Sequence, residues 1–165
     1  MMNMAYRNIL VAVDGSVEAE WAFKKAVNSA KKNNAHLIVC HVIDIQALSP
    51  SPYAFYTDTR FQDAEKFAEE LLTNYSNLAL KAGVTKVETL IEHGSPKTKI
   101  SKKIAPDKHV DLIVCGATGL NAVERILIGS VSQHILRYAK CDVLIVRTPK
   151  EAEEESKPLQ VELTE

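Results

Sequence analysis

Residues 116–132, GATGLNAVERILIGSVS, decide how we expect this chain to fold. They follow VDLIVC at 110–115, an apolar run that is typical of a buried strand. Gly116 and Gly119 interrupt that strand, and a Gly-Ser pair beginning at Gly129 precedes VSQHILRYA, whose apolar residues have helical spacing. The order is therefore strand, glycine loop, short insert, Gly-Ser pair and helix.

This order favours a site for phosphate. Glycines let the backbone approach a ligand closely, and the first N–H groups of a helix attract anions. Ser130 or Ser132 can cap that helix or donate a hydroxyl. The alternative is that the glycines only form turns and the Gly-Ser pair only caps the helix. Neither a P-loop nor a dinucleotide G-x-G-x-x-G motif occurs in the chain.

The rest of the chain alternates strand and helix patterns. Apolar runs predict five strands, at 9–13 (beginning near Tyr6), 36–43, 84–92, 110–115 and 142–147. Helical spacing predicts four helices. The first begins after Ser16, the second spans 61–82, the third runs from Ser95-Pro96 to about Ala105, and the fourth begins after Gly129. Such alternation predicts an α/β fold, an open parallel sheet in the order 3-2-1-4-5 with helices on both faces.

Composition limits the classes of function. The 165 residues are 46% hydrophobic and 25% charged, as in one soluble globular domain. A net charge of −1 argues against binding to nucleic acid or membrane surfaces. Residues 148–165 carry −4, so we divide the chain into a domain at 1–147 and an acidic tail at 148–165. Three cysteines without paired spacing, and no signal-peptide pattern, indicate a cytoplasmic protein without a metal site.

The glycine spacing resembles a known signature. Gly116-x2-Gly119-x9-Gly129-Ser130 is similar to the G-x2-G-x9-G-[S/T] pattern of the ATP-binding branch of the universal stress protein family. ILVAVDGS (9–16), CHVID (40–44) and DLIVCGATG (111–119) are similar too. The resemblance implies bound ATP, or ADP or AMP in its place, with or without Mg²⁺. The positions that match the family's contacts are Ala12, Asp14, Val42, Gly116, Thr118, Gly119, Gly129, Ser130 and Val131.

The expected strand order leads to the same place. Ligands of open α/β sheets bind beyond the carboxyl ends of the strands where the winding reverses, here between strands 1 and 4. A nucleotide base would lie against Ala12 and Val42, with Asp14 accepting a hydrogen bond from ribose or adenine. The alternative for Asp14 is that it caps the first helix. His41 has either a polar role near the site or, as a buried side chain, an internal partner.

Two other segments leave alternatives open. The long connection at 44–60 contains two prolines and three aromatic residues, which either cover a ligand or hold the loop to the surface. Lysines 99, 102 and 103 form a basic face that we interpret as solvated. The edge strand 142–147 is apolar and predicts a homodimer, unless the acidic tail covers it.

No catalytic residues are predicted, because Ser130 lacks a nucleophile-elbow motif. Three functions remain: a nucleotide-dependent regulatory module of the stress response, a slow Mg²⁺-dependent nucleotide hydrolase that uses the same pocket, and a dimeric scaffold with an empty pocket.

Overall fold

The computed structural model describes residues 4–48, 59–119 and 128–149. It contains a five-stranded sheet in the order β3-β2-β1-β4-β5, in which every neighbouring pair is parallel. The predicted strand order is therefore confirmed. The strands are β1 (Asn8–Ala12), β2 (His36–Asp44), β3 (Val87–Gly94), β4 (Leu112–Gly116) and β5 (Asp142–Val146).

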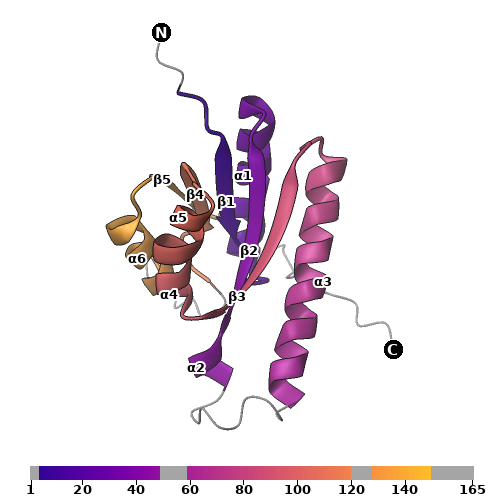
Figure 1. Ribbon diagram of the computed structural model, residues 1–165, viewed down its shortest axis with the longest axis vertical. Helices are drawn as coiled ribbons and strands as arrows, with labels where there is room; N and C mark the ends of the chain where they lie inside the picture. Colours follow the sequence, from indigo (N-terminus) through magenta and orange to yellow (C-terminus); the bar gives the residue numbers. More distant parts are fainter. Residues whose placement is uncertain (1–3, 49–58, 120–127, 150–165) are drawn as a thin grey trace.

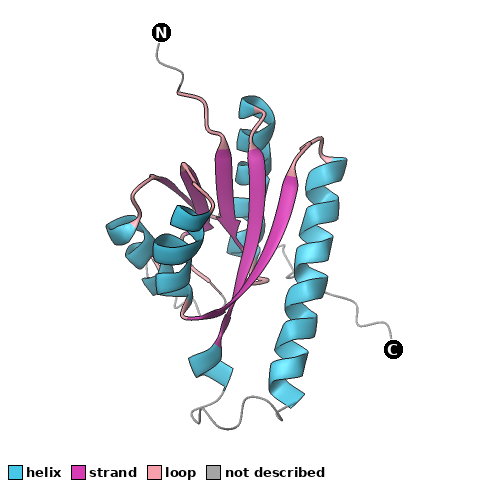
Figure 2. Ribbon diagram, in the orientation of Figure 1, coloured by secondary structure: helices cyan, strands magenta, loops and turns pink. Residues whose placement is uncertain are grey.

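Helices cover both faces of this sheet (Figures 1 and 2). On one face lie the two long helices, α1 (Val17–Asn33) and α3 (Thr59–Lys81). On the other lies a succession of shorter helices: α4 (Pro96–Lys99), a π-helix (η1, Ile100–Ile104), α5 (Ala105–Asp107) and α6 (Ser130–Tyr138). One further short helix, α2 (Ile45–Leu48), follows β2. Each face has its own buried apolar cluster, so the sheet is the middle layer of three.

Local signals explain how α1 begins and ends. The Ser16 hydroxyl accepts a hydrogen bond from the Ala19 N–H at 3.1 Å, which is the cap predicted from the sequence. Asn34 ends the helix in the left-handed conformation, with φ 49°. The buried residues of α1 are mostly alanines, which allows the helix to lie close to the strands. This packing fixes the start of α1 beside the carboxyl ends of β1 and β4.

The predicted end of the helix before Pro106 is wrong. Pro106 lies inside α5, and the chain remains helical to Asp107. Pro lacks an N–H group and its ring clashes with the carbonyl four residues earlier, so an ordinary α-helix does not accommodate it. Here the preceding turn widens into the π-helix, where the Ala105 N–H bonds to the carbonyl of Ile100. The wider turn removes the conflict and the helix continues.

Three smaller expectations also change. The third strand spans Val87–Gly94, whereas we expected it at 84–92. Ser95 precedes α4 as predicted, with Pro96 in the first turn, but its side chain makes no capping hydrogen bond. The predicted connection at 44–60 contains α2, and its residues 49–58 lie outside the described part of the chain. The acidic tail lies outside it as well, from residue 150 onward.

Candidate functional site

The candidate site lies where β1 and β4 end. The two strands are parallel neighbours, with Val11 beside Val114, so their carboxyl ends meet at one edge of the sheet. From this point β2 and β3 continue to one side and β5 to the other. Such a reversal is the place where open α/β sheets bind ligands. The structure thus gives the predicted residues of both strand ends a common location.

Asp14 holds the turn that follows β1. Its Oδ1 accepts hydrogen bonds from the Ser16 N–H at 3.0 Å and the Ser16 hydroxyl at 2.5 Å. Because Ser16 in turn caps α1, the carboxylate orients the capping side chain and does not cap the helix itself. This arrangement is a variant of the alternative that assigned Asp14 to the first helix. The sequence signal for it was the Asp-Gly-Ser order, a common local turn.

The second carboxylate oxygen of Asp14 faces Gly119. A Cβ added to Gly119 would lie 2.6 Å from Oδ2 of Asp14, which is closer than real contacts of this kind. Only glycine fits there without a shift of the carboxylate. The turn after β1 and the loop after β4 are therefore packed against each other at this point.

Gly129 is packed against the same loop from the other side. Its N–H donates to the Ala117 carbonyl at 2.6 Å, and a Cβ added to it would lie 3.4 Å from both the Ala117 oxygen and the Thr118 Cα. The chain before residue 120 and the chain from Gly129 onward are therefore in contact. Residues 120–127, including Arg125, lie outside the described residues. We call 116–119 and 129–131 together the glycine segments.

The glycine segments place the start of α6 beside the loop. Gly129 is the N-cap residue, and no side chain caps the helix, so the expectation that Ser130 or Ser132 caps it is wrong. Ser132 is buried and donates instead to the Gly116 carbonyl at 2.7 Å. Ser130 is exposed at the first helical position. The first N–H groups of α6, which have no partners within a helix, remain available to an anion.

Gly116 serves the packing of the fold. A Cβ added to it would lie 3.0 Å from backbone and side-chain atoms of Glu18 at the start of α1. Gly116 itself is buried and pairs with Val146 in β5. Its glycine identity is thus explained by the close approach of α1 to β4, without any ligand.

Ala12 and Val42 lie on one face of the sheet. Val42 is buried, Ala12 is half-buried, and both belong to the apolar cluster on the side of α6. β1 and β2 are neighbours, with Ala12 beside Cys40, so Val42 is two residues beyond the end of that pairing. Both residues therefore lie on the face of the sheet that α6 covers, and their contact with a nucleotide base stays a prediction.

His41 faces the opposite side of the sheet. Its Nδ1 lies 2.7 Å from the Val13 carbonyl oxygen, and its ring meets that of Phe67 edge-on, with centroids 5.9 Å apart. A ring nitrogen next to a carbonyl oxygen must carry the hydrogen. His41 therefore has the internal partner that one alternative assigned to it, although its side chain is half-buried and not buried.

The two buried cysteines nearest the strand ends are neutral thiols. Burial raises the pKa of Cys115 to about 11 and that of Cys40 to about 12. Nucleophilic cysteines need the thiolate form near neutral pH. Neither side chain therefore supplies a nucleophile beside the glycine segments.

Comparison with known proteins agrees with this geometry. The sequence profile described as the universal stress protein family matches residues 5–147, which is most of the chain. The chain belongs to the universal stress protein family. A universal stress protein of Staphylococcus haemolyticus is 54% identical over 145 residues, which cover 88% of this chain and 87% of that protein.

Two solved universal stress proteins are similar in structure as well. UspA from Lactobacillus plantarum has a TM-score of 0.81 and 31% identity, and the match covers 88% of this chain and all (100%) of that one. A universal stress protein in complex with cAMP has a TM-score of 0.66 and 29% identity, and the match covers 88% of this chain and 99% of the other. The fold of this universal stress protein is thus that of a structurally known group.

Two features are absent from the residues that the structure describes. Within 4–48, 59–119 and 128–149, His, Cys, Asp and Glu side chains form no group of three that is able to hold a metal ion. Among the helices of the same residues, none is long and apolar enough to span a membrane.

Proposed function

We propose that this universal stress protein is a nucleotide-dependent regulatory module that binds ATP, with ADP or AMP as the alternative resident, at the carboxyl edge of its sheet. One observation carries the proposal: the loop after β4 and the start of α6 converge through the contact of Gly129 with Ala117 and Thr118. Backbone amides of two segments then lie together beside the positive end of a helix. This combination is well suited to phosphate oxygens.

The other expected contacts follow from this placement. The phosphates would bind the amides of Thr118, Gly119, Ser130 and Val131, and the base would lie over Ala12 and Val42. A relative that is 29% identical was solved with cAMP, which supports an adenine nucleotide as the ligand class. We assign Asp14, which follows the end of β1, to a hydrogen bond with ribose or adenine.

Regulation is a better-supported role than hydrolysis. A slow Mg²⁺-dependent hydrolase would need a carboxylate that orients water or metal, and the Asp14 carboxylate faces Gly119 of the glycine segments. Its Oδ1 already has two hydrogen bonds to Ser16. If Mg²⁺ accompanies the nucleotide, Asp14 and the exposed Ser130 are the residues that would hold it. Repeated turnover of ATP in the presence of Mg²⁺ would favour the hydrolase.

Substitution of Asp14 by asparagine tests the site. The amide oxygen of Asn keeps an acceptor for Ser16 but lacks the charge, so the hydrogen bonds to Ser16 weaken and the melting temperature should fall by about a few degrees while the protein stays folded. Affinity for ATP should fall about tenfold, because hydrogen bonds to charged groups are stronger than neutral ones by about 1–1.5 kcal/mol. Calorimetric titration measures the affinity. Unchanged affinity with a lowered melting temperature would assign Asp14 to the fold alone.

Mass spectrometry of the small molecules released by denaturing the purified protein identifies the resident nucleotide. An adenine nucleotide in near-stoichiometric amount is the expected result. If no nucleotide is released and calorimetry detects no binding of ATP, ADP or AMP, the protein is the scaffold with an empty pocket. We place the function in the cytoplasm, because all three cysteines are free thiols, as expected in a reducing compartment.

We also propose that the protein is a homodimer through β5. Within the described residues β5 is the last strand of the sheet, and its Leu144 side chain is 39% exposed. An edge strand of this kind pairs readily with another chain, and a two-fold axis closes the contact. Sedimentation of the full chain and of a chain that ends at Pro149 tests this. If both chains are monomers, β5 is not a dimer interface. If only the shorter chain dimerises, the tail covers β5 in the full chain.

A further inference from the structure

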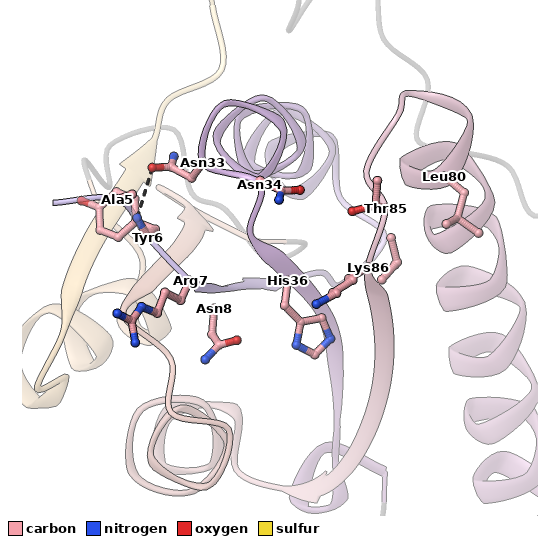
Figure 3. Close-up of a pocket in the computed structure, with 11 residues that line it drawn as sticks. Ala5, Tyr6, Arg7, Asn8, Asn33, Asn34, His36, Leu80, Thr85 and Lys86 are labelled. Atoms are coloured by element: carbon pink, nitrogen blue, oxygen red, sulfur yellow. Dashed lines mark hydrogen bonds between the residues drawn. The ribbon is translucent and has the colours of Figure 1, made fainter. Parts of the chain in front are cut away.

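A cavity of about 780 Å³ lies at the amino edge of the sheet, opposite the glycine segments (Figure 3). It is formed by the starts of β1 and β2, the end of α1 and the turn before β3. Its lining includes six polar or charged side chains, those of Arg7, Asn8, Asn34, His36, Thr85 and Lys86. The lining residues come from three stretches of the sequence, 5–8, 33–36 and 80–87, so no single motif predicted this cavity.

Two cations in the cavity lack an anionic partner. Within the described residues, neither the guanidinium of Arg7 nor the ammonium of Lys86 forms an ion pair. In Figure 3 both side chains lie on the same side of the strands as Asn8 and His36. Both residues are also exposed, so a ligand from solvent reaches them directly.

The acidic groups nearby are already engaged. Glu88 pairs with Lys108 and lies 3.4 Å from Nε2 of His36. The Asp111 carboxylate accepts the backbone N–H groups of Arg7 at 2.8 Å and of Asn8 at 3.1 Å. Neither acidic group forms an ion pair with the side chain of Arg7 or Lys86 among the described residues, although the Asp111 carboxylate lies near Arg7.

Arg7 and Lys86 do not belong to the helices whose ends border the cavity. Basic residues favour the carboxyl ends of helices, which explains Lys31 and Lys32 in the last turn of α1 and Lys81 in that of α3. Arg7 and Lys86 precede strands instead, although the last turns of α1 and α3 also border the cavity. The two side chains therefore bring two positive charges to one cavity in addition to the ends of these helices.

The framework of the cavity is held by hydrogen bonds. Asn33 accepts from the Tyr6 N–H at 3.1 Å and donates to the Ser29 carbonyl at 2.8 Å, which ties the start of β1 to the end of α1. The Asn8 side chain donates to the His109 carbonyl at 3.1 Å. A site whose walls are fixed in this way loses little entropy when a ligand binds.

We propose that this cavity is a second ligand site, which takes a small phosphorylated sugar or polyol. Its volume falls within the range of small-molecule sites. Arg7 offers the paired N–H donors that match phosphate oxygens, and Lys86 adds a second positive charge. The exposed side chains of Asn34 and Thr85 offer hydrogen bonds to the hydroxyl groups of such a molecule. This proposal is independent of nucleotide binding at the opposite edge.

The test is a titration of the full-length, isotope-labelled protein with glucose 6-phosphate, followed by amide chemical shifts. Glucose serves as the uncharged match, at equal ionic strength. Shifts should concentrate at residues 6–8, 33–36 and 85–87, and glucose should cause at most weak ones. The double variant Arg7→Gln, Lys86→Gln should weaken binding about tenfold or more, because two charge-assisted contacts are lost.

A matched control separates contact from net charge. The double variant Lys31→Gln, Lys32→Gln removes the same charge from the same edge, but neither residue lines the cavity. It should change the affinity less than about twofold, since exposed charges at a distance are screened by salt. If both double variants lose affinity for glucose 6-phosphate equally, binding depends only on net charge and the proposal is overturned.

Two other results would also overturn it. Shifts confined to the glycine segments would mean that glucose 6-phosphate binds only at the nucleotide edge. Binding by a chain that ends at Pro149, but not by the full chain, would mean that the acidic tail and not a small phosphate is the natural occupant.

Discussion

Replacing Gly129 by valine should abolish nucleotide binding while the fold is kept. Gly129 has φ −71° and ψ 164°, an extended conformation that any residue adopts. An added Cβ would lie 3.4 Å from the Ala117 oxygen and the Thr118 Cα, which is ordinary contact. The backbone therefore accepts a side chain here, but the two further methyl groups of valine come to lie beside the amides that would hold phosphate.

The size of the effect follows from linkage. A poor N-cap residue costs about 1 kcal/mol, so the variant should melt about 2–4 °C below the parent without ligand. ATP at 100 times its dissociation constant stabilises a binding protein by about 2.7 kcal/mol, or about 5–10 °C for a domain of this size. Differential scanning calorimetry with and without ATP should show this rise for the parent and none for the variant.

Alanine at the same position is the matched control. Gly129→Ala adds only the Cβ, which the structure accommodates, so it should keep part of the rise in melting temperature. The far-ultraviolet circular dichroism of both variants should match the parent. If ATP raises the melting temperature of the valine variant as much as that of the parent, the glycine segments do not bind the phosphates.

Three further predictions concern stability and assembly. Ser132→Ala should cost about 1 kcal/mol in urea unfolding, because it removes the buried hydrogen bond to the Gly116 carbonyl, whereas Ser95→Ala, which removes no capping bond, should cost less than about 0.5 kcal/mol. Burial raises the pKa of Cys40 to about 12, so the unfolded chain loses this thiol proton near pH 9 while the folded chain keeps it. This thiol should therefore lower the free energy of unfolding by about 1.4 kcal/mol per pH unit between pH 9 and 12. Cys40→Ala should make that decline shallower, and an unchanged slope would refute the assignment. Leu144→Lys should convert a β5-mediated dimer into monomers in sedimentation, and a dimer that persists would place the interface elsewhere.

Hydrophobic periodicity was sufficient to predict the sheet. Short apolar runs such as ILVAV at 9–13 and VDLIVC at 110–115 have a length and composition that suit buried parallel strands. Once five strands and the intervening helices are assigned, right-handed crossovers leave few orders, and 3-2-1-4-5 is the one observed. The fold could therefore be read from local patterns and general topology.

Boundaries that depend on tertiary contacts could not be predicted in this way. Pro106 normally ends a helix, but the π-helix before it keeps the chain helical because Ile100 and Ile104 are buried against the sheet. Val84 belongs by pattern to the third strand, yet it is buried ahead of it and its N–H bonds to Ala79 at the end of α3. In both places, packing outweighs the local preference.

The glycine spacing led to the candidate site but did not assign roles within it. Gly116 is required by the approach of α1, and Gly119 by the carboxylate of Asp14, so a side chain at either position disturbs the protein before any ligand is considered. Gly129 alone of these three has room for a Cβ at ordinary contact distance. Lost binding at Gly116 or Gly119 would therefore not distinguish a ligand contact from a packing defect. A substitution at Gly129 makes that distinction, because there the demands of the fold and of the ligand are separate.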